Sequence, residues 1–161
     1  MRSRLGIAIP IVILTITGGA LMTTIASGQT VVHVVSGSGE NGKVAFFDVG
    51  RDGLRLGDRI AARGPLLNES QTDRVGTAYL QCLVHKRIID PDRGLWNCTY
   101  VLELADGEIV LQGLDPRGPG VYELAVVGGT GAYAGANGAA TFTDVDTDAG
   151  AYTDMVISLG G

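Results

Sequence analysis

The chain has 161 residues, enough for a single domain, and it is 45% hydrophobic, with 18% charged residues and 25 glycines. This much glycine disfavours a helical protein, because glycine costs about 1 kcal/mol relative to alanine in a helix. The net charge of −5 and the lack of a Lys/Arg cluster in the sequence disfavour a nucleic-acid partner, which would need many basic phosphate contacts.

The first predicted element is an apolar segment from Leu5 to Ala26, preceded by Arg2 and Arg4. A basic start, an apolar stretch and small residues at its end are typical of an export signal, cleaved here after Ala26. An uncleaved anchor is the alternative, because an apolar helix of this length can span a bilayer about 30 Å thick. We therefore expect a signal peptide or membrane anchor at 1–26 and a folded domain at 27–161. The protein is then secreted or extracytoplasmic, and it contacts a membrane only if residues 5–26 stay attached.

After residue 30, short apolar stretches alternate with turn residues, and no segment shows helical periodicity. Strands are predicted at 31–35, 43–49, 58–62, 75–89, 96–104, 108–114, 121–127, 138–144 and 152–159. The third of these is expected to stop at Gly64-Pro65, and Ala105-Asp106-Gly107 reads as a tight turn. Eight or nine strands with almost no helix predict a barrel or a sandwich. We expect a single eight-stranded antiparallel β-barrel, because closure removes exposed sheet edges.

The two cysteines, Cys82 and Cys98, lie on strands 75–89 and 96–104, which the turn Asp90–Gly94 joins. They therefore face each other within a residue or two of register. Opposed strand positions supply the Cα separation of about 4.4–6.8 Å that a disulfide needs. In an oxidising compartment an isolated pair is more often bridged than free, so we predict a Cys82–Cys98 disulfide.

Alternation along the same two strands predicts which side chains point into the barrel. Ala78, Leu80, Cys82 and Val84 share an apolar face, whereas His85 lies on the opposite face. If Cys98 meets Cys82, Trp96, Tyr100, Leu102 and Leu104 point inward with it. The interior of such a barrel holds side chains or one small ligand. The residues expected to contact a ligand are Ala78, Leu80, Trp96, Tyr100 and Leu102. For the two aromatic residues, plain core packing is the alternative interpretation.

Several stretches, taken in order and spacing, resemble the plant allene oxide cyclases. They are Leu56–Ile60, Arg74–Gly76 leading to Cys82, Thr99-Tyr100, Gln112-Gly113 and Leu124–Tyr133. The last stretch, with Val126-Val127-Gly128-Gly129-Thr130-Gly131, also resembles the signature of dirigent proteins. The resemblance covers 57–143 most clearly and extends over 31–159. It implies an eight-stranded barrel with a central apolar cavity, and a homo-oligomer is compatible with it because many plant members are trimeric.

The resemblance also assigns roles, with some departures. In the cyclases a glutamate and a cysteine lie in the pocket; Cys82 matches the cysteine, and Trp96 matches an aromatic residue that lines the cavity. The glutamate of the first strand has no acidic equivalent, since His33 falls nearest to it, and Gly64 replaces an asparagine that holds a water. Because a bond to Cys98 would also remove the thiol of Cys82, we do not expect allene oxide cyclisation. Tyr100, as a hydrogen-bond donor, and His33, by its position, are the candidate catalytic residues.

Other motifs are better explained by structure. The glycine-rich run 129–135 has no helix-forming sequence after it, as a dinucleotide site requires. A calcium loop starting at Asp144 would need Gly and Glu where the chain has Ala149 and Met155. The two histidines, His33 and His85, supply too few ligands for a metal. We expect neither a metal nor a cofactor, and no spacing of serine, histidine and acid indicates a hydrolase.

The leading hypothesis is a cofactor-free cyclase or isomerase that binds an apolar small molecule in specialised metabolism. Bacterial barrels similar to this one include enzymes that close polyketide rings by pericyclic reactions, which depend mainly on a shaped, dry cavity. Two alternatives stay open, so whether the chain is an enzyme is not decided by its sequence. One is an exported dirigent-like barrel that binds a lipid or phenolic compound without catalysis, and the other is a structural secreted protein. A cavity of about 300 Å³ or more would argue against the structural alternative.

Overall fold

The computed structural model describes residues 29–37, 42–49, 55–86, 95–116, 120–148 and 150–160, with two short strands before them. The strands are β1 (Ile13–Thr15), β2 (Leu21–Thr24), β3 (Thr30–Gly37), β4 (Lys43–Phe47), β5 (Arg59–Leu67), β6 (Arg74–Lys86), β7 (Leu95–Leu104), β8 (Gly107–Asp115), β9 (Val121–Gly129), β10 (Asn137–Thr147) and β11 (Gly150–Gly160). The only helix within this part of the chain is a 3-10 turn, η1 (Gly131–Tyr133). The expected turn Asp90–Gly94 and the expected cleavage site after Ala26 lie outside the described residues.

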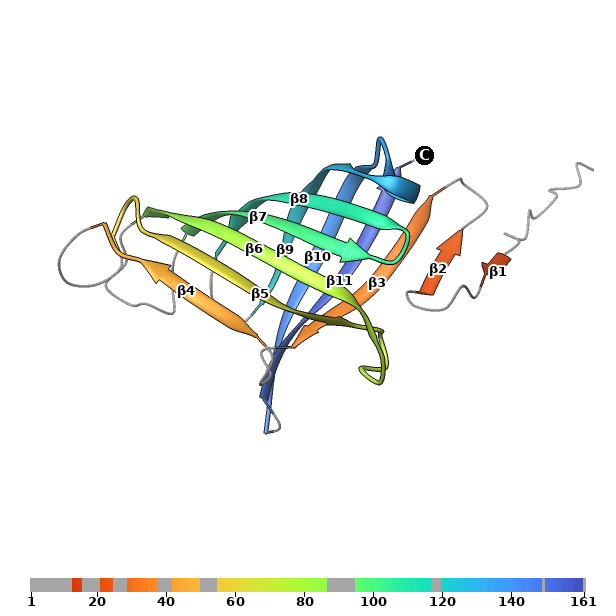
Figure 1. The fold of residues 1–161 in the computed structure, drawn as a ribbon, viewed down its shortest axis with the longest axis horizontal. Coiled ribbons are helices and arrows are strands. Elements are labelled where there is room, and N and C mark those ends of the chain that lie inside the picture. Colours follow the sequence, from red (N-terminus) through yellow and green to blue (C-terminus); the bar gives the residue numbers. More distant parts are fainter. Residues whose placement is uncertain are drawn as a thin grey trace, which may run out of the picture.

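Eight strands close into an antiparallel barrel (Figure 1). Strands β5 to β10 each pair with the next strand in the chain, and the last strand, β11, pairs with β3. The barrel closes where β3 pairs with β5, through Val35 opposite Leu67 and Ser36 opposite Leu66. The predicted all-β, eight-stranded barrel is therefore confirmed, and every predicted strand after residue 30 has a counterpart.

One edge of β5 is shared by two neighbours. Strand β4 pairs with β5 from Arg59 to Arg63, and β3 pairs with Leu66 and Leu67. The prediction that this strand stops at Gly64-Pro65 is wrong, because β5 continues to Leu67. Proline lacks an N–H group and is tolerated in a strand where no ladder bond is required. Pro65 lies where this edge changes partner, and the strand can therefore run through it.

Strands β1 and β2 come from the apolar N-terminal segment. Strand β2 pairs with β3 from Leu21 opposite His33 to Thr24 opposite Thr30, and β1 pairs with β2. Among the described residues, no helix has the length and apolar character needed to cross a membrane. Export, cleavage and anchoring are not tested by these findings and stay predictions.

The barrel interior holds two clusters of buried side chains. The larger cluster includes Val32, Val34, Leu66, Leu102, Ile109, Leu111, Leu124, Ala140, Phe142 and Ile157. The smaller cluster consists of Ile60, Cys82, Val84, Trp96 and Cys98. On β6 and β7 the even-numbered residues from Ala78 to Val84 and from Trp96 to Leu104 lie inside or half inside, and His85 is exposed. The predicted inward faces of both strands are thus confirmed.

The glycine-rich run after β9 closes one end of the barrel. Gly131 has a φ of +59°, and a Cβ there would lie 2.3 Å from the carbonyl oxygen of Asp106. Only glycine permits this approach, which is completed by the Ala132 N–H donating to the same oxygen at 2.8 Å. A three-residue 3-10 turn follows, not an α-helix. The structural interpretation of this run is therefore confirmed, and it does not have the geometry of a dinucleotide site.

Candidate functional site

A cavity of about 240 Å³ lies inside the barrel and is partly open to solvent. Ala78, Leu80, Phe142 and Met155 form apolar parts of its wall. Its polar and charged residues are Arg63, Tyr100, Asp115, Tyr122, Asp144 and Thr153. Ser36, Gly37, Gly42 and Val44, from the ends of β3 and β4, also line it. The volume is below the roughly 300 Å³ that would argue against a structural protein, so it does not decide against that alternative. However, an apolar cavity of about 150 Å³ takes up benzene, so this one admits a molecule or a molecular fragment.

Strand pairing explains why the space exists. Leu80 on β6 lies opposite Tyr100 on β7, and Ala78 lies opposite Leu102. Because inward positions alternate with outward ones, Ala78 is the small member between larger inward residues, and its short side chain leaves volume unfilled. On the other side, Tyr122 on β9 lies opposite Phe142 on β10.

Three aromatic rings form a continuous wall. The ring centroids of Tyr122 and Phe142 are 5.2 Å apart and nearly parallel, with an interplanar angle of 24°. Tyr100 packs on the same phenylalanine at 5.0 Å with a tilt of 56°. Such offset and tilted pairs are the preferred arrangements of aromatic rings. The three rings therefore line the same cavity, and the two tyrosines bring phenol hydroxyl groups to it.

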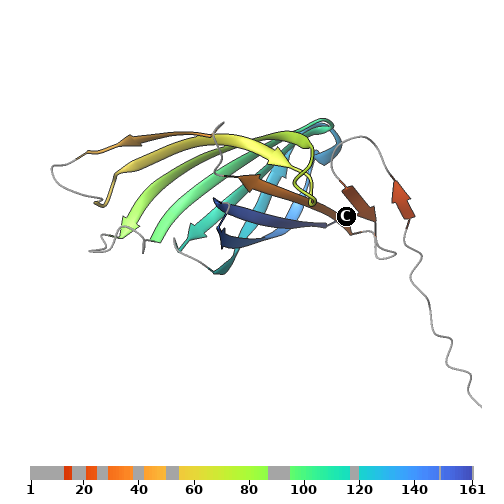
Figure 2. The same cartoon turned by 90° about the horizontal axis from the view of Figure 1, so that it is seen from below.

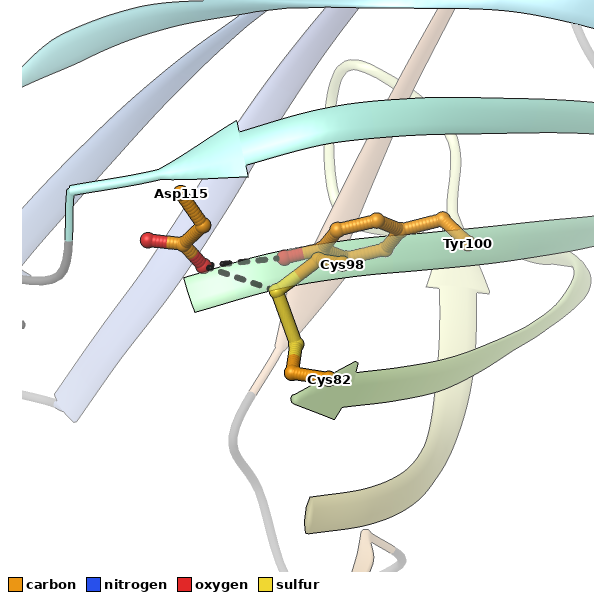
Figure 3. The surroundings of a disulfide bond; sticks show 4 residues. All are labelled: Cys82, Cys98, Tyr100 and Asp115. Carbon is orange, nitrogen blue, oxygen red and sulfur yellow. Dashed lines mark hydrogen bonds between the residues drawn. A yellow bond between two sulfur atoms is a disulfide. The ribbon is translucent and has the colours of Figure 1, made fainter. Parts of the chain in front are cut away.

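The polar groups form a hydrogen-bonded chain that begins at a buried carboxylate. Asp115, at the end of β8, is only 2% exposed. The Tyr100 hydroxyl donates to its Oδ2 over 3.4 Å (Figure 3). The Tyr122 side chain is in turn hydrogen-bonded to Tyr100. Across the cavity, the Thr153 hydroxyl donates to Oδ1 of Asp144 at 2.8 Å.

Burial raises the pKa of Tyr122 far above its usual range, and the neighbouring Tyr100, Asp115 and Asp144 raise it further. Desolvation disfavours the charged phenolate, and nearby negative charge acts in the same direction. The Tyr122 hydroxyl therefore keeps its proton at neutral pH. It is consequently a hydrogen-bond donor in an apolar setting, the kind of group that stabilises negative charge developing on a ligand oxygen.

The predicted disulfide is present. Cys82 and Cys98 lie directly opposite in the β6–β7 ladder, with an S–S distance of 2.04 Å and a Cα–Cα distance of 4.1 Å. The Cys98 sulfur lies 3.9 Å from Oδ2 of Asp115, the same oxygen that accepts from Tyr100 (Figure 3). The bridge thus fixes the two strands beside the polar chain, and it leaves no thiol at the position of Cys82.

The structure brings together three of the predicted site residues: Ala78, Leu80 and Tyr100 all line the cavity. Trp96 and Leu102 are buried in the smaller and larger clusters and are not among the lining residues. His33 alternates with the inward Val32 and Val34, and it does not line the cavity either.

His33 has partners of its own. Its Nε2 lies 2.7 Å from Asp154 Oδ1, and its Nδ1 lies 3.5 Å from Glu69 Oε2. The described residues contain no group of three His, Cys, Asp or Glu side chains that could hold a metal ion.

Sequence reasoning missed Asp115, Tyr122 and Asp144. Tyr122 has the same parity as the apolar Leu124 and Val126, and this was a usable signal for an inward tyrosine. Asp115 precedes Pro116 and follows the predicted strand 108–114, a place where a turn residue is expected. Its burial depends on Tyr100 and Cys98 of the neighbouring strand, which the local sequence does not reveal.

Comparison with known proteins finds relatives by structure only. No protein-family model matches the sequence, and no curated protein matches it. A solved structure of a pyocyanin demethylase has a TM-score of 0.65 and 25% identity, covering 81% of this chain and 99% of that one. A pterocarpan synthase dirigent protein has a TM-score of 0.63 and 22% identity, covering 81% and 86%. An exo-specific intermolecular Diels-Alderase has a TM-score of 0.60 and 16% identity, covering 83% and 98%.

Proposed function

We propose that this chain, which has the barrel fold of the dirigent and allene oxide cyclase-like proteins, binds a mainly apolar small molecule and promotes ring closure in it. The observation that carries the proposal is the row of hydrogen bonds that joins Asp115, Tyr100 and Tyr122 in an aromatic-walled cavity. The fold likeness to a Diels-Alderase supports the same reaction class. The ligand should carry a carbonyl group, because a carbonyl oxygen can accept the hydroxyl proton of Tyr122.

In a cycloaddition, two π bonds are converted into two carbon–carbon σ bonds, and no atom leaves. The barrier is lowered by holding the two reacting parts against each other, which removes much of the entropic cost. The Phe142 ring and the apolar wall can hold a flat conjugated segment in this way. In the free protein Tyr100 donates its proton to Asp115, so the single Tyr122 proton goes to the Tyr100 oxygen. On binding, the Tyr122 hydroxyl turns from Tyr100 and donates to the carbonyl of the electron-poor partner. Removing one donor aimed at developing charge typically costs roughly 10²–10³ in rate.

The test uses a panel of linear molecules, each with a conjugated diene and an α,β-unsaturated ketone. At least one should cyclise faster with the protein than in buffer and give one predominant stereoisomer. Tyr122→Phe should bind that molecule but turn it over roughly 10²-fold more slowly, since it lacks only the donor. Tyr152→Phe, on β11 and outside the cavity-lining residues, is the matched control and should keep its rate. Panel members that bind without any acceleration would contradict the proposed catalysis.

A second candidate is ligand binding without catalysis, as the fold likeness to a dirigent protein allows. The observation that favours it is that the sulfur of Cys82 is in a disulfide and the carboxylate of Asp115 already accepts from Tyr100. The same panel separates the two, because this candidate predicts stoichiometric binding with unchanged rates in both the wild type and Tyr122→Phe.

A further inference from the structure

Strand β4 exposes apolar side chains on both of its faces. All five of its residues are exposed, including Phe46 at 65% and Phe47 at 57%. In the described part of the chain its only partner is β5, so one edge of the strand is free (Figure 2). Long, exposed apolar edge strands are normally blunted or covered in soluble proteins.

The exposed apolar surface continues beyond the end of the strand. Val49 and Leu56 are exposed at 74% and 68%. They are held close to β4 by the buried carboxylate of Asp58, which accepts from the N–H of Val49 at 2.9 Å and from that of Arg55 at 2.6 Å. These bonds also lower the pKa of Asp58, so the carboxylate stays ionised and keeps the segment in place. Phe46, Phe47, Val49 and Leu56 therefore form one projecting edge, which we call the β4 edge.

Basic side chains surround the β4 edge in an acidic protein. Lys43 lies opposite Arg63, and Phe47 lies opposite Arg59 in the β4–β5 ladder, so these four share the outer face. Between residues 43 and 63 the sequence has five Lys and Arg against three Asp, whereas the rest of the chain has seven against 14 acidic residues. The sequence spaces these basic residues apart, and strand pairing brings them together.

The β4 edge also adjoins the cavity. Val44 lies opposite Ala62, Phe46 lies opposite Ile60, and cross-strand partners share a face, so Val44 and Phe46 lie on the inward side. Val44 and Ala62 line the cavity. An apolar molecule leaving the cavity past β4 would meet exposed apolar side chains flanked by basic ones.

We propose that the β4 edge docks on an anionic lipid surface and that an apolar ligand enters the cavity from that side. Aromatic and aliphatic side chains insert at the headgroup boundary, and Lys43, Arg59 and Arg63 meet lipid phosphates or carboxylates. This contact is made by the barrel itself, whereas the sequence indicated membrane contact only through residues 5–26. The proposal does not depend on ring closure.

A second copy of this chain is the competing occupant of the free edge. Pairing two β4 edges would bring two like-charged basic surfaces together, which opposes association. An anionic surface has the complementary charge. The observations thus favour the lipid surface, and self-association becomes an outcome of the test.

The experiment uses the full chain with an environment-sensitive fluorophore on Leu56→Cys, kept under non-reducing conditions. Its matched control carries the label on Val127→Cys, an exposed apolar position on β9. Vesicles are made of neutral phosphatidylcholine alone or with added anionic phosphatidylserine. Because each label reports its own surroundings, insertion of the N-terminal segment does not produce the signal.

The label at position 56 should shift to the blue on anionic vesicles and not on neutral ones, while the label at 127 stays in water. Replacing Arg59 and Arg63 by Gln should lower the docking equilibrium constant by roughly 25-fold, since each basic side chain near such a surface contributes about fivefold. An unchanged label 56 on anionic vesicles, or equal shifts at both labels, would overturn the proposal. A shift that depends on protein concentration without vesicles would assign the β4 edge to a second copy and would also overturn it.

Discussion

The two ends of the barrel are built from the same strands but differ in what fills them. At the end closed by the glycine-rich turn, Ile109 lies opposite Gly129 and is fully buried, and Leu104 and Tyr133 are buried in the same cluster. At the other end lie a cavity, a buried carboxylate and the projecting strand β4. The comparison shows how one small domain can hold an open polar site: filled packing at the closed end supplies stability that the cavity itself does not.

The largest expected effect is a difference between two variants that shorten an inward side chain to alanine. Ile109→Ala at the closed end, opposite Gly129, should lower the free energy of unfolding by about 2–5 kcal/mol, because it leaves a cavity in a filled core. Leu80→Ala at the open end should cost less than about 2 kcal/mol, since its side chain is half-buried beside existing empty space. Urea unfolding of both variants measures the difference, and equal losses would show that the two ends are equally packed.

The disulfide is the main covalent support of the open end. It joins residues 16 apart in sequence. Closing a loop of that length stabilises a protein by about 3 kcal/mol in the chain-entropy model. The free energy of unfolding of Cys82→Ala/Cys98→Ala, measured by urea unfolding, should therefore be lower by about 3 kcal/mol. The oxidised wild type should contain no free thiol. Two reactive thiols in denatured, unreduced wild-type protein would contradict the bridge.

A smaller effect concerns Asp58, which holds the segment next to β4. Its pKa is lowered from 3.8 by amide hydrogen bonds from Val49 and then Arg55. A carboxyl whose folded pKa is depressed stabilises the fold above its unfolded pKa, and this stability is lost as the pH falls through the folded pKa. The free energy of unfolding should therefore drop below pH 3.8 more steeply in the wild type than in Asp58→Asn. The exposed Asp148→Asn should leave the profile unchanged, and identical slopes in wild type and Asp58→Asn would refute the role.

The smallest effect is at alkaline pH. Burial raises the pKa of Tyr122 far above 10 and raises that of Tyr133 to about 12. A raised folded pKa gives stability that is complete below the unfolded value of 10 and declines as the pH rises above it. Tyr122→Phe should therefore lose less stability between pH 10 and 11 than the wild type does. An ultraviolet titration that shows Tyr122 ionising near pH 10 in the folded protein would contradict its burial.

The positions of the strands, the inward faces of β6 and β7 and the disulfide were predictable from the sequence, because alternation and turn residues are local signals. The continuation of β5 through Pro65 was not, since it depends on which strand pairs with each part of the β5 edge. The site was predictable only in part. Ala78, Leu80 and Tyr100 followed from parity, whereas Asp115 and Tyr122 meet only through contacts between β7, β8 and β9.

The most direct test of the account is native mass spectrometry of the protein purified from its own host. Wild type is compared with Ala78→Leu, which fills the cavity, and with Ala125→Leu, a matched change at an exposed position on β9. The account predicts one apolar, carbonyl-bearing molecule per chain in the wild type and in Ala125→Leu, and none in Ala78→Leu. A binding function for this cavity would be contradicted if the wild-type barrel were empty and also bound no member of an apolar ligand panel. It would also be contradicted if Ala78→Leu retained the ligand.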